Sequence, residues 1–233
     1  MWRPAALLAL LAAPAAAEDI ASARYDAPTT RYAHGVLGDA VEWGALVMTG
    51  RSGQVFRLTL PESRVFEDTA PRVVDVDGDG DNEVVVVESD LSRGARLSIY
   101  DTGGLVAAND FIGRPNRWLA PVGNGAADLD GDGLVEFVYV DRPHLAKTLL
   151  VFRRNGERLI QVGALEGYTN HRIGESDIAG GIRDCGQGPE MIVATADWSR
   201  VVSVTFRGGQ FATRDLAAHQ GRETFRDALT CRI

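Results

Sequence analysis

Short apolar runs rich in β-branched residues alternate with polar, turn-forming residues along most of the chain. The clearest runs flank two polar loops, in Val73–Val87 (VVDVDGDGDNEVVVV) and in Ala126–Val140 (AADLDGDGLVEFVYV). Runs of this length, bounded by Gly, Asp and Asn, predict buried strands. Hairpin turns are predicted at Thr102–Gly104, Arg154–Gly156 and Arg207–Gly209. The chain is therefore expected to be all-β.

The strand pattern repeats four times, and each repeat has a glutamate directly before an apolar strand. These glutamates are 41, 53 and 54 residues apart, at Glu42, Glu83, Glu136 and Glu190. Such a period is typical of propellers and other repeat arrays. Four antiparallel strands can be counted in each repeat, which predicts a small β-propeller of about four four-stranded blades, with five as the alternative number. The predicted blades cover residues 30–68, 69–113, 117–163 and 171–215.

The two ends of the predicted propeller differ from its middle. In the first blade we expect four strands, at Thr30–Leu37, Val41–Met48, Gln54–Leu58 and Arg64–Phe66. The tail, residues 216–233, breaks the β pattern. Its Phe225 and Leu229 are four residues apart, which predicts a short helix over Glu223–Leu229 that packs on the last blade.

The motif Asp-x-Asp-Gly-Asp-Gly-x-x-Glu stands between two strands in both central repeats. Carboxylates at alternate positions of a turning loop can converge on one point, and Ca²⁺ binds six to eight oxygen ligands. Gly80 and Gly133 allow the turn, because glycine adopts positive φ without steric cost. We therefore predict about two Ca²⁺ ions. The predicted ligands are Asp75, Asp77, Asp79, Glu83 and the backbone oxygen of Asp81 in the first loop, and Asp128, Asp130, Asp132, Glu136 and the backbone oxygen of Leu134 in the second.

Such acidic loops have three other possible interpretations. An EF-hand requires a glutamate at the twelfth position and flanking helices, but Val86 and Tyr139 stand there. Haloacid-dehalogenase-like phosphatases typically follow Asp-x-Asp-Gly with Thr or Val, whereas Asp79 and Asp132 follow here. A solvated acidic turn without an ion is the remaining alternative. The outer repeats lack the aspartates, since His34, Val36 and Gly38 replace them in the first and only Asp177 and Asp184 remain in the fourth, so no metal is expected there.

Residues 1–17 combine Arg3, a Leu/Ala-rich run and a small-residue end at Ala15-Ala16-Ala17, which predicts a secretory signal peptide cleaved after Ala17. A single soluble domain of 216 residues, 18–233, would then be exported to the periplasm or secreted, with no membrane anchor. Loss of Arg3 changes the formal net charge from −8 to −9. An acidic chain without a basic run argues against nucleic acid or anionic membranes as partners, and a monomer is expected.

The two cysteines, Cys185 and Cys231, are predicted to form a disulfide, because an even pair in an exported protein is normally oxidised. The four histidines are scattered without a metal-binding spacing, and structural or surface roles are expected for them: His34, His144, His171 and His219. No serine stands in Gly-x-Ser-x-Gly, and no glycine loop suits a phosphate. The chain is therefore expected not to be an enzyme.

The arrangement of apolar strand, DxDGDGxxE and apolar strand resembles the FG-GAP/VCBS-type repeat of integrin α-subunit propellers and of many exported bacterial proteins. The resemblance covers roughly residues 30–215. It implies a β-propeller with Ca²⁺ held in the first hairpin of a blade. The function expected is a non-catalytic binding or scaffold module for a protein or glycan partner. The alternative is a hydrolase or lyase of extracellular polysaccharide, which would need two carboxylates or a His/Tyr pair in a pocket away from the loops.

Overall fold

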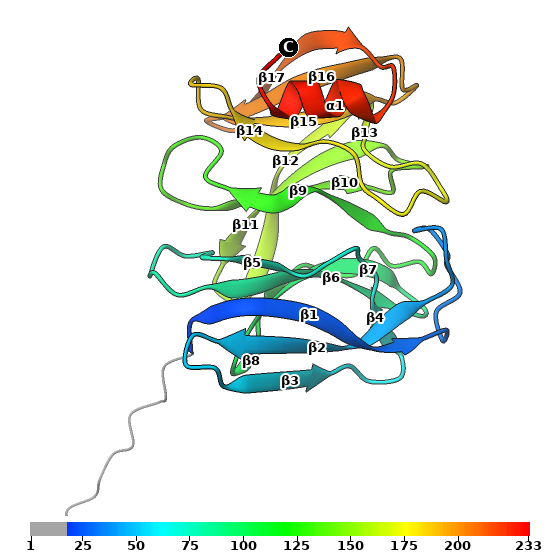
Figure 1. The fold of residues 1–233 in the computed structure, drawn as a ribbon, viewed down its shortest axis with the longest axis vertical. Coiled ribbons are helices and arrows are strands. Elements are labelled where there is room, and N and C mark those ends of the chain that lie inside the picture. Colours follow the sequence, from blue (N-terminus) through cyan, green and yellow to red (C-terminus); the bar gives the residue numbers. More distant parts are fainter. Residues whose placement is uncertain (1–17) are drawn as a thin grey trace, which may run out of the picture.

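The computed structural model describes residues 18–233, so the predicted signal peptide lies outside the described residues. In this part the chain is all-β apart from one helix near the C-terminus (Figure 1). No helix among residues 18–233 has the length and apolar character needed to cross a membrane. The strands are β1 Ile20–Thr29, β2 Glu42–Gly50, β3 Val55–Thr59, β4 Arg64–Phe66, β5 Arg72–Val74, β6 Glu83–Asp90, β7 Gly94–Asp101, β8 Gly104–Ala108, β9 Leu119–Ala127, β10 Glu136–Asp141, β11 Thr148–Asn155, β12 Arg158–Glu166, β13 Tyr168–Thr169, β14 Gly181–Asp184, β15 Pro189–Thr195, β16 Arg200–Arg207 and β17 Gln210–Ala218, and the helix is α1 Arg222–Leu229.

Three of the four predicted repeats form antiparallel meanders of four strands. The second is β5-β6-β7-β8, the third is β9-β10-β11-β12, and the fourth is β14-β15-β16-β17, in which the short β13 also pairs with β15. In each meander the apolar run that follows the repeat's glutamate becomes the second strand. The repeated glutamate thus marks the start of β6, β10 and, to within one residue, β15, as the sequence pattern predicts.

The first repeat differs from the prediction. Its first strand is β1, residues 20–29, whereas the segment predicted as a strand, Thr30–Leu37, forms loops and turns. The segment Arg64–Phe66 forms a strand, but it pairs with β6 of the second repeat over three residues and with β2 at the single pair Trp43–Phe66. The first meander therefore contains three strands, β1-β2-β3, and β4 joins it to its neighbour.

The meanders stack on one another from the N-terminal to the C-terminal end of the molecule (Figure 1). The first twelve strands form one curled mixed sheet, because β4 links β2 to β6 and a parallel bridge between Ala108 and Arg158 links β8 to β12. The other five strands form a second sheet. The first and fourth repeats also touch through their loops, where the N–H of Gly174 donates to the carbonyl of Val36 at 3.1 Å.

The core lies between the stacked meanders. Every residue of β6 and of β10 is buried, including Val84–Val87 and Phe137–Val140, which have no exposed surface. A strand covered on both faces needs a continuous apolar run rather than alternation, and this explains the unbroken valines of the motif. The backbones of the third and fourth meanders approach closely at Gly123 of β9, where an added Cβ would lie 2.8 Å from the Cα of Gly181 in β14. Only a glycine at position 123 fits this approach.

The C-terminal tail covers the fourth meander. Helix α1 begins one residue before the predicted segment and buries Phe225 and Ala228 against β15, β16 and Ala179. The disulfide between Cys185 and Cys231 is confirmed, with a Cα–Cα distance of 5.8 Å. Together the helix and the disulfide fix the chain end to the loop that follows β14.

Candidate metal centres

The first acidic loop joins β5 to β6 and is organised by two of its own carboxylates. Asp75 follows β5, and its carboxylate accepts hydrogen bonds from the N–H groups of Gly78 at 2.7 Å and Gly80 at 3.1 Å. Glu83, the first residue of β6, is buried, and its Oε2 accepts the N–H of Val76 at 3.0 Å. Gly80 has φ +96°, which a residue with a side chain rarely adopts. The backbone thus wraps around the two carboxylates.

The second loop, between β9 and β10, repeats this arrangement bond by bond. Asp128 accepts the N–H groups of Gly131 at 2.7 Å and Gly133 at 3.0 Å, and Glu136 accepts that of Leu129 at 2.7 Å. The sequence identity between the two motifs therefore produces the same loop conformation twice. The fourth repeat has no such loop, because the segment from Asp184 to Glu190 is a shorter hairpin.

Three of the four predicted side-chain ligands come together in each loop. Carboxylate oxygens of Asp75, Asp77 and Glu83 lie within 4.8 Å of one another, as do those of Asp128, Asp130 and Glu136. Asp79 and Asp132 do not belong to these groups; each accepts a backbone N–H two residues further on, at 2.9 Å. The two backbone oxygens that are predicted as ligands, those of Asp81 and Leu134, stay predictions.

The donor set fits a hard cation. All converging atoms are carboxylate oxygens, the ligand type preferred by Ca²⁺, Mg²⁺ and Mn²⁺. The oxygen Oδ1 of Asp130 is buried and accepts no hydrogen bond from residues 18–233. A buried acceptor without a partner is costly, and a cation at the centre of the cluster would supply one. Both loops can therefore hold a metal ion.

Burial gives the glutamate of the first loop an unusual acidity. Burial first, and then the charges of the neighbouring aspartates, raise the pKa of Glu83 to about 7, against the hydrogen bond from Val76. A bound cation would favour the ionised carboxylate, because opposite charge lowers the pKa of an acid.

Arginines distinguish the two loops. The guanidinium of Arg153, on β11 directly opposite Glu136, contacts that carboxylate and those of Asp130 and Asp132, the latter two at 2.9 Å. The first loop receives a single pair, from Arg154 to Asp77 at 2.7 Å. The second cluster is therefore partly neutralised by the protein's own cation, whereas the first is more open to an external ion.

Replacing Arg153 with alanine is expected to raise the Ca²⁺ affinity of the second loop by about tenfold or more, which corresponds to roughly 1.4 kcal/mol. The reason is that a fixed positive charge beside the cluster repels an entering cation. Calorimetric titration of the variant measures the change. The matched control is Arg154→Ala, which should change only the first loop. Equal Ca²⁺ affinities of the second loop in Arg153→Ala and the unaltered protein would contradict the competition.

The outer repeats also have the buried glutamate, but its pKa is shifted in opposite directions in the two repeats. In the fourth, burial raises the pKa of Glu190, but Arg183, which donates to it at 2.9 Å, and Arg214 together outweigh burial and lower the pKa of the carboxyl. In the first, burial and then the charge of Glu67 raise the pKa of Glu42 to about 9. The four equivalent glutamates are thus neutral, open to a cation, or paired with arginine.

Glu42 makes stability depend on pH. Its folded-state pKa lies above the ordinary value of about 4.3, so its contribution to stability is full below that value and is lost as pH rises toward 9. Between pH 5 and pH 8, the stability of Glu42→Gln relative to the unaltered protein is expected to rise by about 4 kcal/mol. Urea unfolding at both pH values measures this. Glu62→Gln, at an exposed site, should show no such difference.

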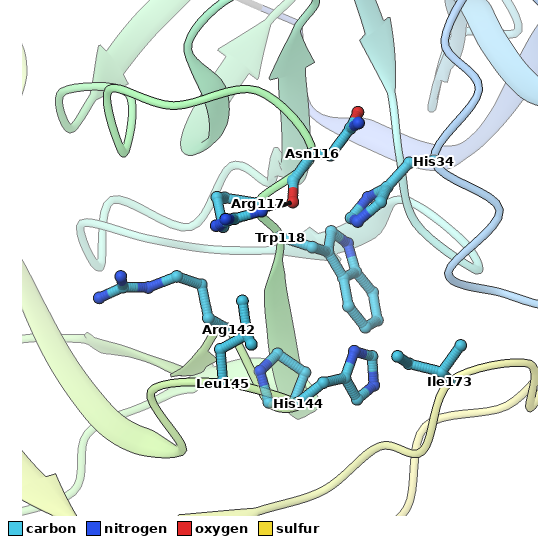
Figure 2. A pocket seen from close by; sticks show the side chains of 9 residues that line it. His34, Asn116, Arg117, Trp118, Arg142, His144, Leu145 and Ile173 are labelled. Carbon is cyan, nitrogen blue, oxygen red and sulfur yellow. Dashed lines mark hydrogen bonds between the residues drawn. The ribbon is translucent and has the colours of Figure 1, made fainter.

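A cavity that the sequence pattern did not predict lies at the other edge of the meanders. It has a volume of about 280 Å³ and is lined by loops of the first, third and fourth repeats and by Asn116, which lies between β8 and β9 (Figure 2). Two of the scattered histidines face it, and a third contacts it indirectly; they are His34, His144 and His171. No spacing in the sequence reveals this meeting, because the loops are brought together only by the stacking of the repeats.

No protein-family model and no curated protein sequence matches the chain. Among solved structures, the chain is similar to the crystal structure of the rhamnogalacturonan lyase YesW, at 18% sequence identity and a TM-score of 0.45. The alignment covers 77% of this chain and 38% of the lyase chain, so this chain spans well under half of that protein's length.

Proposed function

We propose that this chain is an exported Ca²⁺-binding β-repeat protein of the FG-GAP/VCBS type, and that its ions stabilise hairpins rather than take part in a reaction. The observation that carries the proposal is the repetition of one loop, bond for bond, with three converging carboxylates each time. A solvated acidic turn has no need of that convergence, since like charges repel at such distances.

Calcium would act by joining the two strands of a hairpin. In the first loop the ligands lie just after β5 and at the first residue of β6, so a bound ion connects both strands. Without an ion the clustered carboxylates repel one another; with it, the repulsion is replaced by coordination. Exported Ca²⁺ modules bind at about 10⁻⁴–10⁻³ M, and occupancy would follow the calcium outside the cell.

The proposed role of the folded domain follows from this arrangement. We propose a single non-catalytic domain, built as a small β-propeller, that acts as a monomer and presents one face to a protein or glycan partner. Export is supported by the disulfide, because such bonds persist in oxidising compartments. Calcium would keep the hairpins, and with them the binding face, in one conformation.

Thermal unfolding of residues 18–233 with Ca²⁺, Mg²⁺ or chelator tests the proposal. Ca²⁺ at 100 times its Kd should raise the free energy of unfolding by about 2.7 kcal/mol for each occupied site. This corresponds to a rise in Tm of roughly 5–10 °C per site. Mg²⁺ should do less, since it demands stricter geometry.

Matched variants separate calcium binding from general stabilisation. The double variant Asp77→Asn/Asp130→Asn should lose the response to Ca²⁺. Asp81→Asn should keep it, because only the backbone oxygen of this residue is a predicted ligand. A Tm that Ca²⁺ leaves unchanged, or raises equally in the double variant, would refute the proposal.

A further inference from the structure

The cavity of about 280 Å³ lies at the edge where β9 begins and β10 ends. The second acidic loop joins the opposite ends of the same two strands and the first joins β5 to β6, and no residue of either loop lines the cavity, so it is separate from the metal centres. Figure 2 shows Arg117 and Arg142 on one side and His34, Trp118 and His144 on the other. The cavity is somewhat smaller than most small-molecule sites, which measure about 300–1,000 Å³.

One wall of the cavity is apolar and open to solvent. Ile173 is 72% exposed and Leu145 is 63% exposed, the highest values among the large hydrophobic side chains of residues 18–233. Both line this cavity. Single exposed apolar residues are common, but their meeting at a concave site is typical of a binding surface.

His34 is held by a buried carboxylate. Its Nδ1 contacts Oε1 of Glu67, which has no exposed surface and also accepts a hydrogen bond from the hydroxyl of Ser89. Trp118 fixes the same segment by donating from Nε1 to the carbonyl of Glu67 at 2.7 Å. Where Nδ1 donates its hydrogen to Glu67, Nε2 is the ring nitrogen available to accept a hydrogen bond. Nε2 has no partner within residues 18–233.

A chain of hydrogen bonds sets the tautomer of His144. His171 Nε2 lies 2.8 Å from the carbonyl of Glu175 and must donate to it, which leaves its Nδ1 as an acceptor. That Nδ1 lies 2.9 Å from Nε2 of His144, which must therefore carry the hydrogen. Burial lowers the pKa of both rings, that of His144 to about 4, so both are neutral. His144 Nδ1 is thus a second acceptor.

Arg117 supplies a positive charge that no carboxylate of residues 18–233 neutralises. Within these residues the one hydrogen bond of its guanidinium is to the carbonyl of Asn116, at 2.8 Å. Arg142, in contrast, is paired with Asp141 at 2.7 Å. The backbone around them is fixed, since the N–H of Arg142 donates to the carbonyl of Trp118 at 2.9 Å. Asn116 and Arg142 have φ of +51° and +43°, an unfavourable conformation that often marks binding sites.

We propose that this cavity binds a small cyclic molecule that carries hydroxyls and a carboxylate, such as a sugar acid. Arg117 would pair with the carboxylate, the acceptors His34 Nε2 and His144 Nδ1 would receive hydroxyl hydrogens, and the wall of Ile173 and Leu145 would cover the apolar face of a ring. The proposal extends the proposed function, because a sugar acid is one form of glycan partner, but it does not depend on calcium.

Calorimetric titration of residues 18–233 with three probes, in excess Ca²⁺, tests the proposal. Glucuronate is expected to bind with a Kd on the order of 0.1–1 mM. Glucose lacks the carboxylate and cyclohexanecarboxylate lacks the hydroxyls, so each should bind at least about tenfold more weakly than glucuronate. Absence of glucuronate binding, or equal binding of either other probe, would overturn the assignment.

Variants place the ligand in the cavity. Arg117→Ala should weaken glucuronate binding about tenfold or more, whereas Arg114→Ala, exposed in the same loop and outside the cavity, should leave it unchanged. His144→Ala should also weaken the binding of glucuronate. Replacing Arg117 in this variant should then weaken glucuronate binding further, by the same factor as in the unaltered protein. Unchanged affinity in Arg117→Ala and His144→Ala would overturn the site. Glucuronate binding should persist in chelator, so a failure of the calcium proposal would leave this result intact.

Discussion

Replacing Arg183 with alanine is expected to lower the free energy of unfolding by about 3–5 kcal/mol, because it leaves a buried carboxylate without its cation. The Arg183 side chain is 3% exposed and donates to Glu190 at 2.9 Å and to the carbonyl of Ile233 at 2.7 Å. It also bonds to the carbonyl of Ala228 at the end of α1. One side chain thus joins β14, β15 and the C-terminal tail. Urea unfolding measures the loss.

The same carboxylate provides its own control. Arg214 contacts Glu190 at 3.3 Å, but its side chain is 60% exposed. Exposed ion pairs contribute about 0–1 kcal/mol, so Arg214→Ala should change stability little. Similar losses in the two variants would show that the burial of Arg183 does not matter. In that case Arg183 would not have, beside the glutamate of the fourth repeat, the role that a metal ion has beside the glutamates of the two acidic loops.

Replacing both Cys185 and Cys231 with serine is expected to lower the free energy of unfolding by about 4 kcal/mol. The disulfide closes a segment with a sequence separation of 46 residues, and the chain-entropy model gives this value for that length. The segment contains β15, β16, β17 and α1, nearly all of the fourth meander. Chemical unfolding of the oxidised protein and of the double variant measures the difference.

The position of the disulfide also predicts where the loss is felt. Amide hydrogen exchange should accelerate in β15–β17 and α1 of the double variant and change little in β1–β3, because the first meander lies at the opposite end of the stack (Figure 1). A loss below about 1 kcal/mol, or faster exchange throughout, would contradict the assignment of the disulfide to the fourth meander.

The sequence predicted the features that short segments determine. The acidic loops depend on glycines and aspartates within nine residues, so their conformation follows from local chemistry, as the bonds from Asp75 to Gly78 and Gly80 show. The buried strands β6 and β10 are unbroken apolar runs. The disulfide was predicted because the chain has only two cysteines.

The first repeat was predicted less well, for a physical reason. Strand β1, IASARYDAPT, contains few large apolar residues; only Ile20 and Tyr25 are buried. Its existence depends on pairing with β2, which extends from Ile20 to Thr29. The pairing of Arg64–Phe66 with β6 rather than with the first meander likewise depends on residues distant in the sequence. Local propensity is a weak guide where tertiary pairing decides.

Long-range contacts also set the chemistry of the sites. Arg153 reaches the second cluster because β10 and β11 pair in a register that places it opposite Glu136. In the second repeat the paired register of β6 and β7 ends at Val84 and Tyr100, and Arg154 contacts Asp77 rather than Glu83. The glutamate of the second loop therefore has an arginine beside it that the glutamate of the first loop lacks among residues 18–233. Near-identical motifs are thus expected to bind calcium with different strengths.

The most direct test of calcium binding is calorimetric titration of Ca²⁺ into metal-free residues 18–233. We predict two sites of unequal affinity, the weaker one at the second loop, where Arg153 competes. Asp77→Asn should remove the stronger site and Asp130→Asn the weaker one. Absence of binding up to about 10⁻² M Ca²⁺, well above the range of exported calcium modules, or a stoichiometry that neither substitution changes, would contradict the account.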